Sequence, residues 1–168
     1  MLFDLKTFTH VHVVISLIGI ASGFVVLCGL LTGRRLNRWT TLFLASTVAT
    51  SVTGFGFPLT HFGAPHWVGV ISLFVLAVAI FARYVHHLAG AWRWIYVVSA
   101  ALALYLNVFV GVVQAFQKLS ALKALAPTQS EPPFLLTQLV VLMIFIALAV
   151  VAARRFRVEP AHLPVSVA

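Results

Sequence analysis

The chain has 168 residues, of which 62% are hydrophobic and 8% are charged, and its mean hydropathy is +1.08. A soluble domain averages about 25% charged residues, so this chain has too little polar surface to cover a water-soluble globule. The net charge of +8 comes from basic residues that stand between apolar segments. This placement favours contact with anionic lipid head groups over nucleic-acid binding. The composition therefore predicts an integral membrane protein.

Five apolar segments are long enough to cross the membrane, because a helix needs about 20 residues to span ~30 Å of hydrocarbon. These segments are residues 11–32, 40–58, 66–85, 94–116 and 134–153. The preceding "MLFDLKTF" does not resemble a signal peptide, and we expect it to be retained. A short interfacial helix is predicted at 117–126, before the prolines of "APTQSEPP" interrupt it. The expected fold is an all-α bundle of five transmembrane helices forming a single domain over residues 1–168.

Two short strings recur at nearly the same spacing. "VISL" occurs at 14–17 and 70–73, and "RW" occurs at 38–39 and 93–94. One interpretation is a duplicated helical hairpin, in which spans one and two correspond to spans three and four and the fifth span is an addition. The other is a chance match in a chain rich in Val, Ile, Leu and Ser. A true repeat would make His10 and His66 equivalent.

The charges at the ends of the spans predict the orientation of the chain. With five spans, all eight arginines fall on one side of the membrane and all three lysines fall on the other. Basic residues in short loops favour the cytoplasmic side. We therefore expect the arginine side to be cytoplasmic, the N-terminus to be outside and the C-terminus to be inside.

Histidines gather at the predicted outer side, where they are candidate ligands for haem b or a transition metal. Two histidines on different helices can hold a haem from both faces. His10 and His12 point about 200° apart on a helix, so only one of them can face the bundle. The repeat favours His10, whereas the small-residue face with Ser16 favours His12. Contact with the membrane interface and pH sensing are the alternative roles. The candidate metal ligands are His10, His12, His61 and His66.

Polar groups inside the spans suggest a second part of the site. Asn107 and Gln114 are seven residues apart and therefore lie on one helical face, which we expect to turn inward. They either bond neighbouring helices or bind a cofactor such as a quinone, together with His10, His12 and His66. The span cores contain no Asp, Glu or Lys, which argues against a proton-driven carrier.

The connection before the fifth span contains Glu131, one of the two acidic residues that we place outside. It belongs either to a solvated loop or to a cap in which its carboxylate pairs with a lysine or histidine. No sequence motif for a nucleophile, a phosphate loop or a clustered metal site is present, so no catalytic residue is assigned.

Three strings resemble a family of small, functionally uncharacterised bacterial membrane proteins: "TSVTGFGFP" (50–58), "LALYLNVFV" (102–110) and "LAPTQSEPPF" (125–134). The resemblance implies a bacterial inner-membrane protein and supplies no activity, cofactor or site residue. Three functions remain open: a haem- or metal-binding redox or accessory protein, a structural subunit of a homo-oligomer or larger membrane complex, and a channel or facilitator for small solutes lined by Thr50, Asn107 and Gln114.

Overall fold

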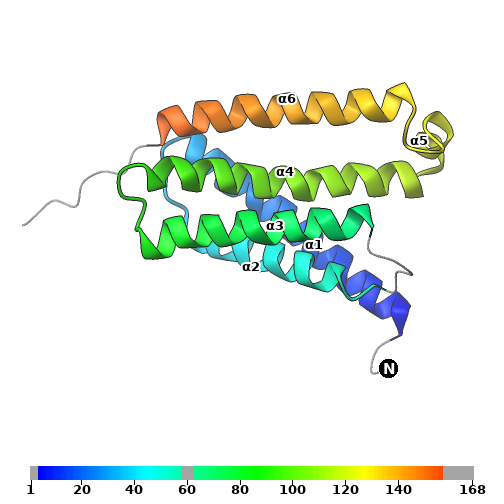
Figure 1. Ribbon diagram of the computed structural model, residues 1–168, viewed down its shortest axis with the longest axis horizontal. Helices are drawn as coiled ribbons and strands as arrows, with labels where there is room; N and C mark the ends of the chain where they lie inside the picture. The colour runs from blue at the N-terminus through cyan, green and yellow to red at the C-terminus, as the bar shows by residue number, and fades with distance from the viewer. Residues whose placement is uncertain (1–3, 58–62, 157–168) are drawn as a thin grey trace, which may run out of the picture.

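The helices lie side by side as a bundle (Figure 1). The computed structural model describes residues 4–57 and 63–156, and within these stretches all regular structure is helical. This confirms the all-α fold. The elements are α1 (Leu5–Leu31), α2 (Asn37–Gly54), α3 (Ala64–Ile80), the π-helical turn η1 (Phe81–Val85), α4 (Trp92–Lys118), α5 (Ser120–Leu125) and α6 (Pro132–Arg155).

Four of these helical stretches are long and apolar enough to cross a membrane, and are therefore compatible with membrane insertion. They are α1, α3 continued through η1, α4 and α6. The second predicted span, α2, is not among them. It begins with Asn37 and Arg38 and is rich in serine and threonine, which lowers its hydropathy. The predicted count of five spans is thus not confirmed by length and composition alone.

Several boundaries differ from the predicted ones. The first helix begins at Leu5, six residues before the predicted start at residue 11. The second helix ends at Gly54, and the predicted end at Pro58 lies outside the described residues. The interfacial helix is reduced to Ser120–Leu125, because α4 continues to Lys118.

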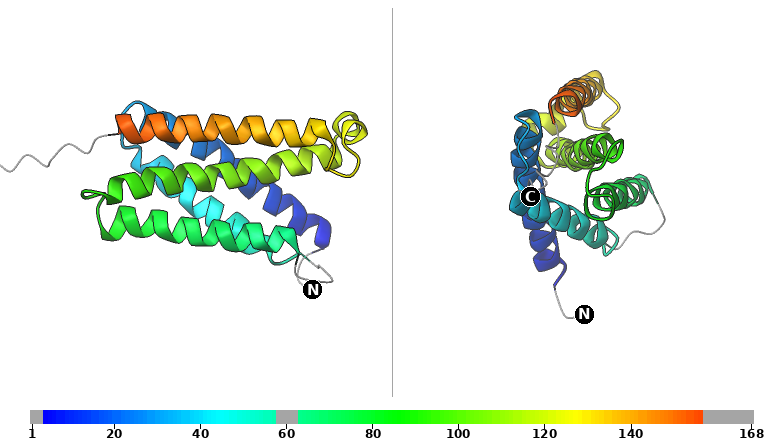
Figure 2. Two further views of the ribbon diagram at one scale, coloured as in Figure 1. Left: turned by 45° about the horizontal axis from the view of Figure 1, so that its top comes forward. Right: turned by 90° about the vertical axis from the view of Figure 1, so that its left-hand side faces the viewer.

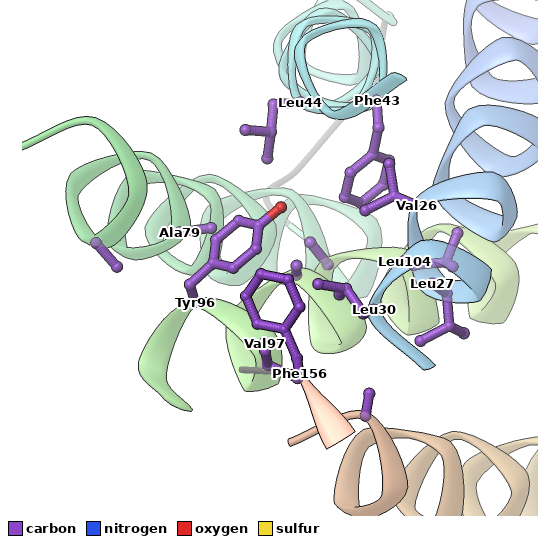
Figure 3. Packing of buried hydrophobic residues seen from close by; sticks show 14 of the residues in the cluster. Val26, Leu27, Leu30, Phe43, Leu44, Ala79, Tyr96, Val97, Leu104 and Phe156 are labelled. Carbon is purple, nitrogen blue, oxygen red and sulfur yellow. The ribbon is translucent and has the colours of Figure 1, made fainter. Parts of the chain in front are cut away.

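Helix α4 lies at the centre of the bundle, where it packs against α1, α3 and α6 (Figure 2). Its small residues Ala100 and Ala103 are buried, so its neighbours approach closely. Figure 3 shows the apolar core formed between these helices. Large members of the core are Val26, Leu27, Leu30, Phe43, Leu44, Leu76, Tyr96, Leu104 and Phe156.

Arginines and lysines lie at opposite ends of the bundle. Helices α1, α3 and α6 end, and α2 and α4 begin, at the left of Figure 1, which we call the arginine end. The opposite end, where α1, α3 and α6 begin, is the lysine end, to which Lys6, Lys118 and Lys123 belong. The described arginines at the arginine end are Arg34, Arg35, Arg38, Arg83, Arg93, Arg154 and Arg155.

Candidate functional site

His12 lies between α1 and α2 near the lysine end and is held there by a hydrogen bond. Its Nδ1 is 2.7 Å from Oγ1 of Thr53 on α2, and the ring of Phe57 packs edge-on against the imidazole at a centroid distance of 5.1 Å. Gly54 leaves room beside the ring, since a Cβ there would lie 3.9 Å from Cε1. His10 is exposed. The structure thus turns His12, and not His10, toward the bundle.

The hydroxyl of Thr53 fixes the tautomer of His12. This hydroxyl donates its proton to the carbonyl of Ala49 at 2.7 Å, so its oxygen is left to accept a proton from His12 Nδ1. We therefore assign the proton to Nδ1, which leaves the lone pair of Nε2 available. An imidazole that donates from one nitrogen to a protein oxygen and offers the other is the usual arrangement of a metal-ligating histidine.

His66 is held differently. The backbone N–H of Gly63 donates to its Nδ1 at 3.1 Å, so the neutral ring carries its proton on Nε2. Its ring also packs against Phe55 at a centroid distance of 5.7 Å. Nδ1 of His66 is therefore an acceptor, whereas we assign Nδ1 of His12 as a donor. His61, the fourth candidate, lies outside the described residues.

A line of polar side chains continues from His12 along the contact of α1 and α2 toward α4. We call it the polar seam. Asn107 of α4 donates to the hydroxyl of Thr47 at 3.3 Å, and Gly19 makes room for both, since a Cβ there would lie 3.1 Å from Asn107 Nδ2 and 3.2 Å from Thr47 Oγ1. The buried hydroxyl of Thr50 has no hydrogen-bond partner. The members of the polar seam are His12, Ser16, Gly19, Ser46, Thr47, Thr50, Thr53 and Asn107.

The predicted polar face of α4 is only partly internal. Asn107 lies inside the bundle, but Gln114 is exposed, although Phe116 two residues later is buried against Phe134 of α6. Sequence reasoning missed Gln138 of α6, which is buried and donates to the carbonyl of Phe109 at 3.2 Å. Gln138 could have been identified from the sequence, because it is a single carboxamide in an otherwise apolar stretch.

Other internal polar groups join helices or bond to their own helix. The hydroxyl of Ser51 on α2 donates to that of Ser72 on α3 at 3.0 Å, and Ser46 donates to the carbonyl of Leu42. Bonds to a helix's own carbonyls allow hydroxyl residues to lie in an apolar environment. Beyond the polar seam, the arginine half of the bundle is filled by the apolar core, so we see no continuous polar path through the described residues.

Glu131 does not pair with a lysine or histidine of the described residues. Its carboxylate accepts hydrogen bonds from the N–H and hydroxyl of Thr128 at 3.1 and 2.9 Å, and from the N–H of Ser130 at 3.1 Å. Partial burial raises the pKa of this carboxyl, but the hydrogen bonds outweigh that effect and hold the pKa below its ordinary value of 4.5. Glu131 thus closes the turn that leads into α6.

Within the described residues, no group of three or more His, Cys, Asp or Glu side chains is arranged to hold a metal ion. Cys28 is exposed on α1. Among the described residues, His12 is the imidazole that belongs to the polar seam.

Comparison with protein-family models, with curated proteins and with solved structures gives no match to this chain. The functional argument therefore rests on the geometry of the site.

Proposed function

We propose that this chain is a five-span protein of the bacterial inner membrane with its arginine end in the cytoplasm. The direction of the helices supports the fifth span. Helices α1 and α3 both run from the lysine end to the arginine end, and both are apolar enough to cross a membrane. If both cross, α2 must return through the same thickness, and its 18 residues reach about 27 Å at 1.5 Å per residue.

The burial pattern supports a duplicated hairpin. A shift of 56 residues carries the buried Gly19, Gly23 and Val26 of α1 onto Val75, Ala79 and Ala82, which are also buried. The same shift carries Thr40, Phe43, Leu44 and Thr47 of α2 onto Tyr96, Ser99, Ala100 and Ala103, all of them buried. The correspondence fails at the arginine end, where Leu27 would align with the half-buried Arg83. It also fails within the second helix pair, where the exposed Thr41 and Ala45 would align with the buried Val97 and Ala101.

Within this frame the proposed function is a non-enzymatic accessory protein that holds a haem iron or a transition-metal ion through Nε2 of His12. The observation that carries it is the orientation of His12 by Thr53, which leaves Nε2 as the nitrogen available to a ligand. An imidazole that is held through one nitrogen and offers the other is typical of a metal-ligating histidine. The bound group would supply redox or Lewis-acid chemistry, while His12 binds it and Thr53 positions His12.

The test is an optical spectrum and an elemental analysis of protein purified from membranes. We expect either a Soret band or near-stoichiometric Cu, Zn or Fe. His12→Gln should abolish it, and Thr53→Val should weaken binding about 10- to 100-fold, as is usual when the hydrogen-bond partner of a metal-ligating histidine is lost. His10→Gln is the matched control, because it removes an exposed imidazole two residues away.

Wild-type protein without a Soret band and without bound metal would overturn this proposal. So would equal losses in His12→Gln and His10→Gln, since the exposed residue has no part in the polar seam.

A second candidate function, a subunit of a membrane assembly, is favoured by the exposure of α6. Only 17% of its most apolar window is buried, against 39% for α1 and for α4. Met143 lies on its exposed face. Met143→Cys in a Cys28→Ser background should form cross-linked species in native membranes, and a chain that remains entirely monomeric under oxidation would exclude a symmetric contact at this face.

A further inference from the structure

The arginine end carries positive charge for which the described residues provide no carboxylate. The chain has three acidic residues. Asp4 precedes α1 and Glu131 precedes α6, so both belong to the lysine end, and Glu159 lies outside the described residues. Seven described arginines thus share one end of the bundle without an acidic side chain among them. Such a concentration of positive charge attracts anions.

Arg83 is held in a defined place by contacts with two helices. It lies in the π-helical turn η1, and its Nη2 donates to Oδ1 of Asn37, the first residue of α2, at 2.7 Å. Its guanidinium carbon lies 5.4 Å from the ring centroid of Tyr96 and 5.5 Å from that of Tyr84, within the range of cation–π attraction. Tyr84 is itself held by a 3.2 Å contact between its hydroxyl and that of Thr41. The guanidinium is therefore fixed between α2 and α4.

Among the described residues, no carboxylate pairs with Arg83, and its Nε is buried without a hydrogen-bond partner. Tyr96, whose ring lies against the guanidinium, is only 1% exposed, and Figure 3 shows its hydroxyl directed toward α2. A half-buried guanidinium without a carboxylate partner is stabilised when an anion approaches its accessible N–H groups. Helix α2 begins beside it with no side-chain cap and no acidic residue in its first turn, so its positive dipole end adds to the same field.

We propose that Arg83, together with Asn37, Tyr84 and the first turn of α2, forms a binding site for the phosphate group of one anionic phospholipid. The planar guanidinium suits a phosphate, because two parallel N–H groups can donate to two phosphate oxygens. The site lies where a phospholipid head group would be in a spanning bundle. Large exposed aromatic side chains lie at the same end of the bundle, and aromatic residues of this kind favour the head-group level of a bilayer: Trp39, Tyr84 and Trp94.

This inference is independent of the proposed role of His12, since the two sites lie at opposite ends of the bundle. The test measures the thermal midpoint of purified full-length protein in micelles titrated with phosphatidylglycerol, phosphatidylcholine or inorganic phosphate. Phosphatidylglycerol at 100 times its dissociation constant should raise the midpoint by roughly 5–11 °C, and the other two should have little effect.

Matched variants locate the site. Arg83→Gln should weaken phosphatidylglycerol binding about 10- to 100-fold, the loss expected for a charge-assisted hydrogen bond. Arg83→Lys keeps the positive charge but removes the two parallel N–H donors of the guanidinium. This variant should bind phosphatidylglycerol more weakly than the wild type. Arg35→Gln removes the same charge from an exposed loop at the same end and should bind nearly normally. Because each variant is compared with itself with and without lipid, a change in its basal stability does not affect the result.

The contradicting outcomes are distinct. Equal losses in Arg83→Gln and Arg35→Gln would mean diffuse attraction without a site, and stabilisation by inorganic phosphate alone would mean a site for a soluble anion. No lipid dependence in the wild type would overturn the proposal. Glu159→Gln tests whether the chain supplies its own counter-ion: if this variant gains a phosphatidylglycerol response that the wild type lacks, Glu159 occupies the position that we assign to the phosphate.

Discussion

Gly23 provides the sharpest test of how the bundle is packed. It lies on the face of α1 that meets α2 and α4, and a Cβ at this position would be 2.5 Å from Cδ1 of Leu104 and 2.9 Å from two ring carbons of Phe43. Real Cβ atoms do not approach other heavy atoms so closely. Leu104 and Phe43 are each only 1% exposed, so both are enclosed by neighbouring side chains. Gly23→Ala must therefore displace these side chains or push the helices apart.

The magnitude follows from two opposing effects. Overpacking a closed core costs about 1–3 kcal/mol, whereas replacing glycine by alanine inside a helix returns up to about 1 kcal/mol. We expect Gly23→Ala to lower the free energy of unfolding by about 1–2 kcal/mol. The matched control is Gly111→Ala on α4, where the added Cβ would meet only Cδ1 of Ile20 at an ordinary 3.7 Å. That variant should be neutral or stabilised by up to about 1 kcal/mol.

The assay is reversible unfolding of the purified protein in mixed micelles, followed by circular dichroism as the fraction of denaturing detergent increases. Equal stabilities of Gly23→Ala and Gly111→Ala would refute the packing of α1 against α2 and α4. A stable Gly23→Ala protein with altered cross-linking between these helices would show that the interface adapts by sliding, which would also contradict the assumption of a closed core.

Three further predictions follow from single contacts. Gln138→Leu should be neutral or stabilising in the same assay, because it removes the buried Oε1, which has no partner among the described residues, together with a 3.2 Å hydrogen bond to α4. A decrease in the free energy of unfolding above about 2 kcal/mol would show that this hydrogen bond is structurally essential. Ser72→Ala removes the hydrogen bond from Ser51 and should lower the free energy of unfolding by about 0.6 kcal/mol, as is typical of hydrogen bonds between membrane helices. An undetectable change in the same assay would show that this contact makes no net contribution to stability. The turn at 128–130 should be protected from amide hydrogen exchange above pH 4.5, the ordinary pKa of Glu131, and should lose protection as the pH falls through the lowered pKa of the folded state; Glu131→Gln should remove this pH dependence.

The helical class and the segregation of charge could be predicted from the sequence because each depends on local properties. Long apolar segments form helices, and the spacing of the basic residues places arginines at one end of the bundle and lysines at the other. Helix ends were predicted less well. The start of α1 at Leu5 and the short α5 depend on which residues find neighbours to pack against, and the hydropathy of a segment does not contain that information.

The candidate site was predicted only as a set of residue types. His10 and His12 were equally plausible because a helix can be rotated about its axis without changing its hydropathy. The contact with Thr53 breaks this ambiguity, and it depends on the close approach of α1 and α2 at Gly19 and Gly23. Gln114 was expected inside because it shares a face with Asn107. It is exposed, because the neighbouring helices cover this face of α4 at Asn107 and leave it open at Gln114.

The sequence by itself determined that this chain forms apolar helices with arginines gathered at one end, because hydropathy and charge are properties of each segment alone. Only the tertiary structure decided which histidine turns inward, which nitrogen it offers, and which arginine is fixed against tyrosine rings. Those choices depend on the rotation and separation of neighbouring helices, and they are set by the few small residues that allow the backbones to meet.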